Sequence, residues 1–427
     1  MKQFILSFFL NLYAVIMRLL RTIKCTPKRH LSILTIPPAS FGNLGDEAMM
    51  IAIVEYFSSQ GANRVGFISW QSNDNWEDFD PVDGKIEICH HHLYFNWKGF
   101  FQFIHLLNYY DQFYCPGADV MDGYYSEYGS LTRLKYALLA AKTGAKAAIL
   151  GFSFNNKPTP KVIQSFRDLP SDVIICARDP VSQERLLHHL QRPVKLVADL
   201  AFLLHPSPEP AILLAVVEWI ERQRASERII IGINANYISF RDLGEQVINN
   251  LVKVYVNNLV KMYSSNNKLK LSYVFIPHSF SCNEQEISDI NLSEKIFKSL
   301  PEEVKYNCVK VTPPFSSKDV KFLCGKLDIV LTGRMHLAIA CLGQGTPVAC
   351  ISYQGKVEGL FKHFDLEGMI IDPDQAVQGV NLCNFFLSII EKREDIRNHI
   401  QIRLPKIQGL ALENFKFCKS NNSNLFQ

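Results

Sequence analysis

The chain has 427 residues, of which 48% are hydrophobic, and its formal net charge at pH 7 is +4. This length exceeds the roughly 250–300 residues at which a single hydrophobic core stops growing, so two domains are expected. The mild charge, and the lack of a long basic run interleaved with aromatic residues, argue against a nucleic-acid partner.

The first 30 residues differ in character from the rest. Residues 4–17 are apolar except for Ser7 and Asn11, and five basic residues follow between positions 18 and 29. This run is shorter than the roughly 20 apolar residues of a membrane-spanning helix, which favours an interfacial helix over a true anchor. A signal peptide is weaker, since Lys2 is its sole n-region charge and no small-residue cleavage site follows. An apolar helix docked on the protein itself is the remaining alternative.

Residues 31–204 alternate short β-branched apolar runs with longer amphipathic segments, a pattern typical of βα units and a largely parallel sheet. We expect strands at 31–36, 65–69, 112–115, 147–151, 173–177 and 194–198, with helices at 47–57, 131–142 and 182–189.

A domain boundary is expected at residues 205–210, where three prolines in six residues interrupt any helix or ladder. Residues 211–418 then restart the alternation. The expected strands are 229–234, 272–276, 328–331 and 347–351, and the expected helices lie near 245–263, 284–299 and 335–342. The predicted fold class is therefore α/β, with two Rossmann-like domains facing a cleft.

In open α/β sheets, ligands bind beyond the carboxyl ends of strands, and the most informative such position is residues 331–337. A helix begins there, so free backbone N–H groups together with Arg334 offer fixed positive charge to an anionic ligand. His336, in the first helical turn, could act as a general acid near neutral pH. The alternative is a capping or core histidine.

A second candidate loop, residues 41–47, follows the first expected strand. Gly45 would let the backbone approach a ligand closely, and Asp46 could cap the helix or offer a carboxylate to a hydroxyl group. The G-x-G-x-x-G spacing of a dinucleotide site is absent. A glycine turn with an aspartate cap is also compatible with a purely structural role.

Three further strand ends carry polar candidates. Asp122 lies in the loop after the strand at 112–115, where turn chemistry is the alternative. Arg178, after the strand at 173–177, could bind an anion or pair with Asp179. Tyr353 and Lys356 follow the strand at 347–351, although Lys356 could be a solvated surface charge.

No metal site is predicted. The triplet His90-His91-His92 has no acidic or cysteine partner at ligand spacing, and consecutive strand residues point to opposite faces. Neither a G-x-S-x-G elbow nor a Walker motif is present, which leaves hydrolase and NTPase functions without support. The eleven cysteines are odd in number, contain no C-x-x-C pair, and are typical of reduced cytosolic thiols.

Together these motifs resemble the polysaccharide pyruvyl transferase family over residues 33–366. The most specific part is G-R-M-H-L-A at 333–338, followed by G-T-P-V at 345–348 and I-S-Y-Q-G-K at 351–356. The family's amino-terminal loop matches G-N-L-G-D at 42–46. Its Arg-Asp-x-x-Ser and Asp-Pro-Ala-Phe elements match R-D-P-V-S at 178–182 and D-L-A-F at 199–202.

The resemblance implies a GT-B-like enzyme that moves the enolpyruvyl group of phosphoenolpyruvate onto hydroxyls of a free or lipid-linked saccharide. Phosphoenolpyruvate is then a co-substrate, and no other cofactor is implied. The family's donor-binding residues match Arg178, Arg334 and His336, with His336 as the proton donor. Further substrate contacts are expected from the residues Asn43, Gly45, Met335, Tyr353 and Lys356. The base or hydroxyl-orienting group is assigned to Asp46 or Asp122.

Two positions depart from the family pattern. The glycine triplet expected after the strand at 112–115 is Pro116-Gly117-Ala118, which leaves the fit of the acceptor open. Met335 replaces the usual leucine, a change that conserves volume. The first domain, 31–204, is expected to bind the acceptor, and the second, 211–418, phosphoenolpyruvate. The enzyme would be cytoplasmic and peripheral at the inner face of the membrane through residues 1–30. Rival functions are a nucleotide-sugar glycosyltransferase and a non-catalytic assembly factor.

Overall fold

The computed structural model describes residues 2–23, 31–39, 41–69, 76, 79–94, 96–264, 269–280, 288–352 and 357–418. The chain forms two compact units. The first unit comprises Met1–Phe41, Met49–Leu200 and Gly409–Gln427. The second comprises Gly42–Ala48 and Ala201–Gln408. Residues 42–48 thus belong to the second unit although first-unit segments precede and follow them, and residues 409–427 belong to the first unit although they follow the second in sequence. The prolines of 205–210 lie near the start of the second unit's main segment.

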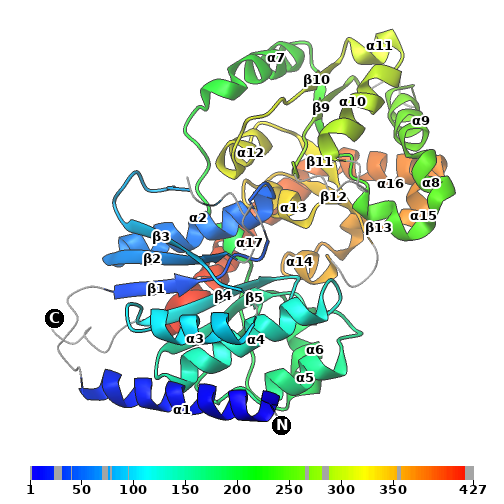
Figure 1. The fold of residues 1–427 in the computed structure, drawn as a ribbon. Coiled ribbons are helices and arrows are strands. Elements are labelled where there is room, and N and C mark those ends of the chain that lie inside the picture. Colours follow the sequence, from blue (N-terminus) through cyan, green and yellow to red (C-terminus); the bar gives the residue numbers. More distant parts are fainter. Residues whose placement is uncertain are drawn as a thin grey trace. The chain divides into compact units, whose positions relative to one another are not determined.

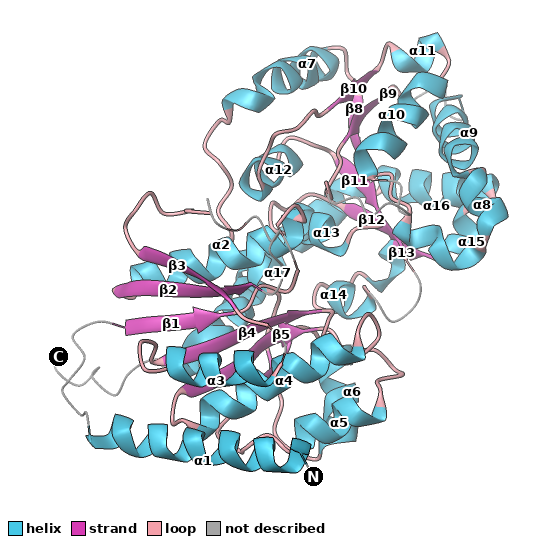
Figure 2. Cartoon of the chain, viewed as in Figure 1, coloured by secondary structure: helices cyan, strands magenta, loops and turns pink. Residues whose placement is uncertain are grey.

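The first unit is built on a parallel seven-stranded sheet of order β3-β2-β1-β4-β5-β6-β7 (Figures 1 and 2). The strands are β1 (Leu31–Thr35), β2 (Ala62–Ser69), β3 (Glu87–His92), β4 (Gln112–Ala118), β5 (Lys146–Phe152), β6 (Ile174–Ala177) and β7 (Lys195–Leu196). The helices are α1 (Lys2–Ile23), α2 (Leu44–Ser59), α3 (Trp97–Leu106), α4 (Glu127–Lys142), α5 (Pro160–Arg167), α6 (Pro180–Leu190) and the 3-10 segment η5 (Glu413–Cys418). All six expected strands are present, and β3 is an additional edge strand.

Helices cover both faces of the first sheet. Phe113 and Tyr114 are consecutive residues of β4, so their side chains point to opposite faces. The ring of Phe113 lies 5.2 Å from Phe103 of α3, while Tyr114 stacks at 5.1 Å on Phe57 of α2. Because both faces are covered, the strand is buried along its whole length, which fits the mainly apolar sequence that follows Gln112.

The second unit has a parallel six-stranded sheet of order β10-β9-β8-β11-β12-β13 (Figure 1). Its strands are β8 (Ile229–Ile233), β9 (Leu271–Phe275), β10 (Cys308–Lys310), β11 (Ile329–Thr332), β12 (Val348–Ile351) and β13 (Ile370–Ile371). Its helices are α7 (Leu214–Ala225), α8 (Glu245–Asn249), α9 (Leu251–Ser264), α10 (Asp289–Ser299), α11 (Glu302–Lys305), α12 (Ser317–Cys324), α13 (Met335–Leu342), α14 (Glu358–Lys362), α15 (Pro373–Ala376), α16 (Gly379–Glu391) and α17 (Arg393–Leu412). Short 3-10 segments complete it: η1 (Leu200–Leu203), which begins at the last residue of the first unit's main segment, η2 (Ala211–Leu213), η3 (Ile238–Leu243) and η4 (Glu367–Met369).

The predicted elements of the second half are found with small changes. The strands β8, β9, β11 and β12 fall within one residue of their expected ends, and α13 has the expected bounds. The helix expected at 245–263 is divided at Asn250 into α8 and α9. The helix expected at 284–299 begins at Asp289, where the Ser288 hydroxyl accepts a hydrogen bond from the Asn291 amide as an N-cap.

Helix α1 is long and apolar enough over Ile5–Ile23 to cross a membrane, judged by length and composition alone. In this structure it belongs to the first unit and packs on α3 and α4. Leu10, Ala14 and Met17 share a buried cluster with residues of those two helices. The expectation of a helix in the first 30 residues is thus met over Lys2–Ile23.

Candidate active site

The candidate site lies at the carboxyl edge of the second sheet, between β8 and β11. From β8 the chain continues through β9 and β10 on one side, whereas β11 leads through β12 to β13 on the other. The strand order therefore reverses between β8 and β11, and open α/β sheets bind ligands outside such a switch point. The loops that leave β8, β9 and β11 there carry most of the polar residues described below.

Asp289, the first residue of α10, accepts hydrogen bonds from three other residues of this edge. Its carboxylate is fully buried and accepts hydrogen bonds from Arg334 through Nη2 at 2.7 Å and Nε at 3.2 Å. It also accepts from the Asn234 amide nitrogen at 3.0 Å and from the His278 backbone N–H at 3.1 Å. One carboxylate thus joins the loops after three neighbouring strands.

Arg334 is held in place from two directions. Its backbone N–H donates to the Thr332 hydroxyl at 2.9 Å, and that hydroxyl donates to the Asn234 side-chain oxygen at 2.9 Å. Its guanidinium makes the two-point contact with Asp289, and 19% of the side chain is exposed. A planar guanidinium fixed in this way is pre-organised to bind phosphate or carboxylate. The sequence placed Arg334 correctly at the start of α13 but gave no sign of Asp289.

His336 lies in the first turn of α13, half-buried, against the loop that contains Gly45. A Cβ atom at Gly45 would lie 2.2 Å from His336 Nδ1, so a side chain there would displace the imidazole. Gly45 and His336, two predicted site residues that are far apart in the sequence, are therefore neighbours. Met335, the predicted residue between Arg334 and His336, is buried.

The segment Gly42–Ala48 is attached to the second unit at several points. Phe280 N–H donates to the Gly42 carbonyl at 2.9 Å, and Asn43 forms an antiparallel bridge with Ser279 in the loop after β9. The Asn43 side-chain oxygen accepts from Gly45 N–H at 3.0 Å, which shapes the turn. This attachment explains why Asn43 and Gly45 belong with the carboxyl-terminal site residues.

Two acidic residues follow in the first turn of α2, and both are buried. Glu47 accepts hydrogen bonds from the Ser317 amide and hydroxyl, each at 3.0 Å, at the start of α12. Burial raises the pKa of the Glu47 carboxyl, against the lowering effect of the two Ser317 hydrogen bonds. Asp46, predicted to be a base or a hydroxyl-orienting group, is 4% exposed.

His278 and Asn236 are also polar residues of this edge, but neither is among the predicted site residues. Within the described residues, neither ring nitrogen of His278 has a hydrogen-bond partner, and Asn236 Nδ2 has no acceptor. Both side chains are buried. A Cβ at Gly333 would lie 2.2 Å from Asn236 Nδ2, so this amide borders the turn that precedes Arg334. Buried polar atoms are nearly always paired, and such exceptions commonly mark water or ligand positions.

The His278 imidazole is held in its neutral form. Burial lowers its pKa well below the usual value, and the positive charges of His336 and Arg334 lower it further. The free energy of unfolding should therefore fall as the pH drops below about 6.5, because the unfolded chain takes up a proton that the folded chain resists.

Urea unfolding at about pH 7.5 and about pH 5.5 measures this effect. A His278→Gln variant should lose less stability than wild type between the two pH values, whereas the exposed-histidine variant His188→Gln should lose as much. Parallel behaviour of wild type and His278→Gln would contradict the neutral, buried imidazole.

Arg178 lies in the first unit, directly after β6, and is buried. Its Nη1 pairs with Asp199 at 3.0 Å, and its Nε donates to the Ser153 hydroxyl at 2.7 Å. Asp179 caps α6 instead, accepting from the Ser182 amide and hydroxyl, each at 2.7 Å. The sequence offered two roles for Arg178, binding an anion or pairing with Asp179. In the structure its ion-pair partner is Asp199.

Arg178→Ala should lower the free energy of unfolding by about 3 kcal/mol or more, because it leaves the buried Asp199 carboxylate without this cation. Denaturant unfolding provides the measurement. As a control, Arg222→Ala removes an exposed arginine whose nearest carboxylate oxygen is 3.9 Å away, and should change stability by less than about 0.5 kcal/mol. Equal effects of the two variants would contradict the structural role of Arg178.

Asp122 also lies in the first unit, in the loop after β4. It accepts hydrogen bonds from the backbone N–H groups of Tyr124 at 2.9 Å and Asn155 at 3.2 Å. Burial raises the pKa of its carboxyl, and these two hydrogen bonds act in the opposite direction. The carboxylate thus joins the loop after β4 to the loop after β5. Tyr353 and Lys356, the remaining predicted contacts, lie outside the described residues.

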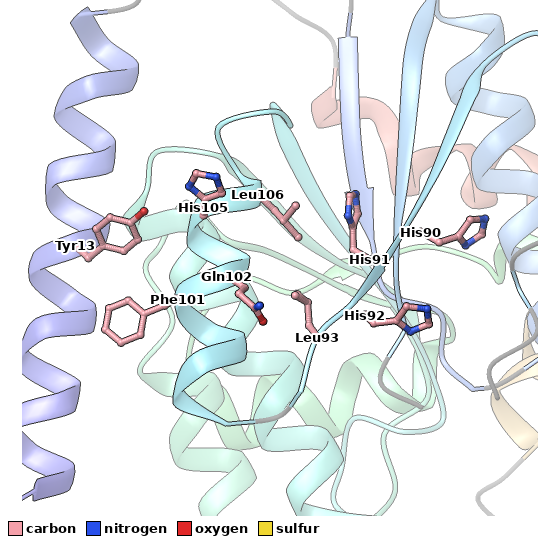
Figure 3. A pocket seen from close by; sticks show the side chains of 9 residues that line it. All are labelled: Tyr13, His90, His91, His92, Leu93, Phe101, Gln102, His105 and Leu106. Carbon is pink, nitrogen blue, oxygen red and sulfur yellow. The ribbon is translucent and has the colours of Figure 1, made fainter. Parts of the chain in front are cut away.

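The histidine triplet lies on β3, beside a pocket of about 610 Å³ that also includes residues of α1 and α3 (Figure 3). His91 Nε2 lies 2.7 Å from the Tyr110 hydroxyl, and His92 Nδ1 lies 2.7 Å from the Ser69 hydroxyl. Figure 3 shows the His90 and His92 side chains extending to the same side of β3, and the His91 side chain extending in another direction. In the part of the chain that the structure describes, no group of three or more His, Cys, Asp or Glu residues is placed to hold a metal ion.

Comparisons with known proteins agree with this organisation. A sequence profile described as polysaccharide pyruvyl transferase matches residues 43–355. No curated protein sequence matches the chain.

Among solved structures, a putative UDP-N-acetylglucosamine 2-epimerase from Listeria monocytogenes has a TM-score of 0.59 at 13% identity, covering 90% of this chain and 94% of its own. A ugt transferase from Siraitia grosvenorii in complex with UDP has a TM-score of 0.55 at 8% identity, covering 91% and 98%. A UDP-forming trehalose-phosphate synthase from Burkholderia vietnamiensis has a TM-score of 0.51 at 11% identity, covering 91% and 98%. At these identities the likeness shows the fold alone, and it confirms the predicted class of two Rossmann-like, GT-B-type domains.

Proposed function

The chain belongs to the polysaccharide pyruvyl transferase family, and on that premise we propose that it transfers the enolpyruvyl group of phosphoenolpyruvate to sugar hydroxyls. The acceptor is a polysaccharide or its lipid-linked precursor, the product is a pyruvate ketal, and phosphate is released. The single observation that carries this proposal is the grouping of Arg334, His336 and the Gly45 loop at one sheet edge, where β8 and β11 diverge.

Arg334 is the proposed anchor of the donor. Phosphoenolpyruvate carries a phosphate and a carboxylate, and a guanidinium oriented by Asp289 can bind either group without first ordering its own side chain. The unpaired Asn236 Nδ2 and the neutral His278 imidazole supply further hydrogen-bonding atoms at the same edge. In this arrangement Arg334 supplies the positive charge that binds the donor, and hydrogen bonds to Asn236 and His278 orient the donor.

His336 is the proposed general acid. Its imidazolium transfers a proton to the methylene carbon of phosphoenolpyruvate, which becomes a methyl group, and C2 becomes an oxocarbenium-like centre. A sugar hydroxyl adds to C2, the C2–O bond to phosphate breaks, and a second hydroxyl of the same sugar closes the ketal. Of the two hydroxyl protons, one restores His336 to its charged form and the other leaves with the phosphate as hydrogen phosphate. Asp46, which lies in the second unit, is the proposed base, and Asp122, which lies in the first unit, is the alternative.

The cytoplasm is the proposed location. Eight described cysteines are free thiols, and all of them except Cys89 are buried. Small buried thiols without disulfides suit a reducing compartment, in which phosphoenolpyruvate is also available.

The reaction is tested by incubating the purified protein with phosphoenolpyruvate and a panel of lipid-linked oligosaccharides. We expect acceptor-dependent phosphate release, with a gain in acceptor mass equal to pyruvic acid less one water. Thermal unfolding distinguishes the rival glycosyltransferase function, which the structural likeness to UDP-dependent enzymes keeps open. Stabilisation by phosphoenolpyruvate supports the proposal, whereas stabilisation by UDP or GDP sugars alone supports the rival. A protein that binds neither donor would fit a non-catalytic assembly factor.

A further inference from the structure

Helix α1 is apolar on two opposite faces, and the protein covers one of them. On the covered face, Leu10, Ala14 and Met17 are buried within the core of the first unit. Tyr13 packs against Phe101 of α3 with ring centroids 5.8 Å apart, and Figure 3 shows this pair beside the pocket. The helix is therefore seated on the unit along one side.

Polar contacts at the middle and near the carboxyl-terminal end of α1 hold it in this position. Lys142 of α4 donates to the Asn11 side-chain oxygen at 2.7 Å, and Arg21 Nη2 donates to the Tyr110 carbonyl at 2.7 Å. These contacts, like the apolar ones, would be lost if the helix left the unit to stand across a bilayer. A transmembrane orientation is therefore incompatible with the docked position.

The opposite face of α1 is apolar and uncovered. Nine apolar side chains between Ile5 and Ile23 are 43% to 79% exposed. Six of them follow one another at intervals of three or four residues, namely Ile5, Phe8, Leu12, Val15, Leu19 and Ile23. This spacing aligns them on one side of the 22-residue helix, and the stripe from Ile5 to Ile23 is about 27 Å long at 1.5 Å per residue. Soluble proteins rarely expose a continuous apolar surface of this size.

The charge of the surrounding sequence indicates what covers this stripe. Asp46 is the first acidic residue of the chain, and six lysine or arginine residues precede it. Arg18 lies within the helix, and Lys24, Lys28 and Arg29 follow its end in sequence. A basic, acid-free segment that carries an apolar stripe matches an anionic lipid surface, in which aliphatic chains lie beneath negative headgroups.

We propose that α1 lies in the interface of an anionic membrane, its axis along the surface, with the stripe from Ile5 to Ile23 inserted and the face of Leu10 and Met17 docked on the protein. One face of the helix then contacts the first unit, and the opposite face contacts the lipid. This inference does not depend on the proposed reaction, so either can fail without the other.

Cosedimentation of the full chain with vesicles tests the proposal. Wild type should bind vesicles of phosphatidylethanolamine and phosphatidylglycerol. The triple variant Phe8→Glu, Leu12→Glu, Leu19→Glu should lose at least about 100-fold in vesicle partitioning, since three exposed apolar side chains become charged. A matched control changes three other exposed apolar residues, with the substitutions Tyr306→Glu, Ile402→Glu and Leu412→Glu, and should bind as wild type does. Equal loss in both variants, or in neither, would overturn the proposal.

The orientation of the helix has a separate readout. Positions 8 and 19 are eleven residues apart, so a spanning helix would place them about 16 Å apart in depth, whereas a helix lying in the interface keeps them at similar depths. Quenching by brominated lipids, measured on Phe8→Trp and Leu19→Trp as differences from wild type, should show similar depths. Clearly different depths would overturn the interfacial orientation. A lipid-free dimer that the triple Glu variant abolishes, without vesicle binding by wild type, would assign the stripe to a second copy.

Discussion

Replacing His336 by glutamine should lower kcat for ketal formation by about 10²–10⁴-fold, with a much smaller change in the KM for phosphoenolpyruvate. Glutamine keeps a hydrogen-bonding side chain of similar reach beside Gly45 but cannot deliver a proton to carbon. The anchor of the donor, Arg334, is unchanged in this variant because its hydrogen bonds run to Asp289 and Thr332. The loss should therefore appear in the chemical step.

Steady-state phosphate release, with acceptor saturating, measures this split between kcat and KM. His188→Gln is the control, since it makes the same change at an exposed position on α6 in the first unit. Activity of His336→Gln within a few-fold of wild type would remove the histidine from the role of acid.

The second large effect is expected at Asp289, which touches no substrate in the proposal and acts by positioning Arg334. Asp289→Ala leaves Arg334, Asn234 and the His278 amide without their shared acceptor. We expect a loss of about 3 kcal/mol or more in the free energy of unfolding, as for other broken buried ion pairs. The KM for phosphoenolpyruvate should rise at least about 10-fold, because the guanidinium loses its fixed orientation.

A double-mutant cycle separates positioning from a general loss of stability. If Asp289 acts through Arg334, the double variant Asp289→Ala, Arg334→Ala should raise the KM no further than Arg334→Ala alone. Asp289→Asn retains an acceptor oxygen and should recover part of the affinity. Additive effects of the two single variants on KM would show that Asp289 influences the donor by another route.

The sequence predicted the second unit well where local signals are strong. The apolar run that forms α13 is preceded by Gly333 and Arg334 and followed by Gly343, so its bounds could be read directly. The strands β8 and β11 are continuous apolar segments, as strands covered on both faces must be. The placement of Arg334 at a strand end followed from these two patterns, and the family resemblance is confirmed by the profile match.

The remaining parts of the site depend on tertiary contacts that leave no local pattern. Asp289 is one of many acidic residues, and only the fold shows that its carboxylate joins three loops. The docking of Gly42–Ala48 on the second unit requires the bridge between Asn43 and Ser279, which are far apart in sequence. In β3, three consecutive histidines interrupt the alternation that would have indicated a strand.

The central claim is that the edge between β8 and β11 binds phosphoenolpyruvate through Arg334. Calorimetric titration of phosphoenolpyruvate into wild type and Arg334→Ala tests it most directly. We expect saturable binding to wild type and an affinity at least about 10-fold weaker in the variant, because charge-assisted hydrogen bonds to the donor are lost. Equal affinity in the two proteins, or binding of a UDP sugar in place of phosphoenolpyruvate, would contradict it.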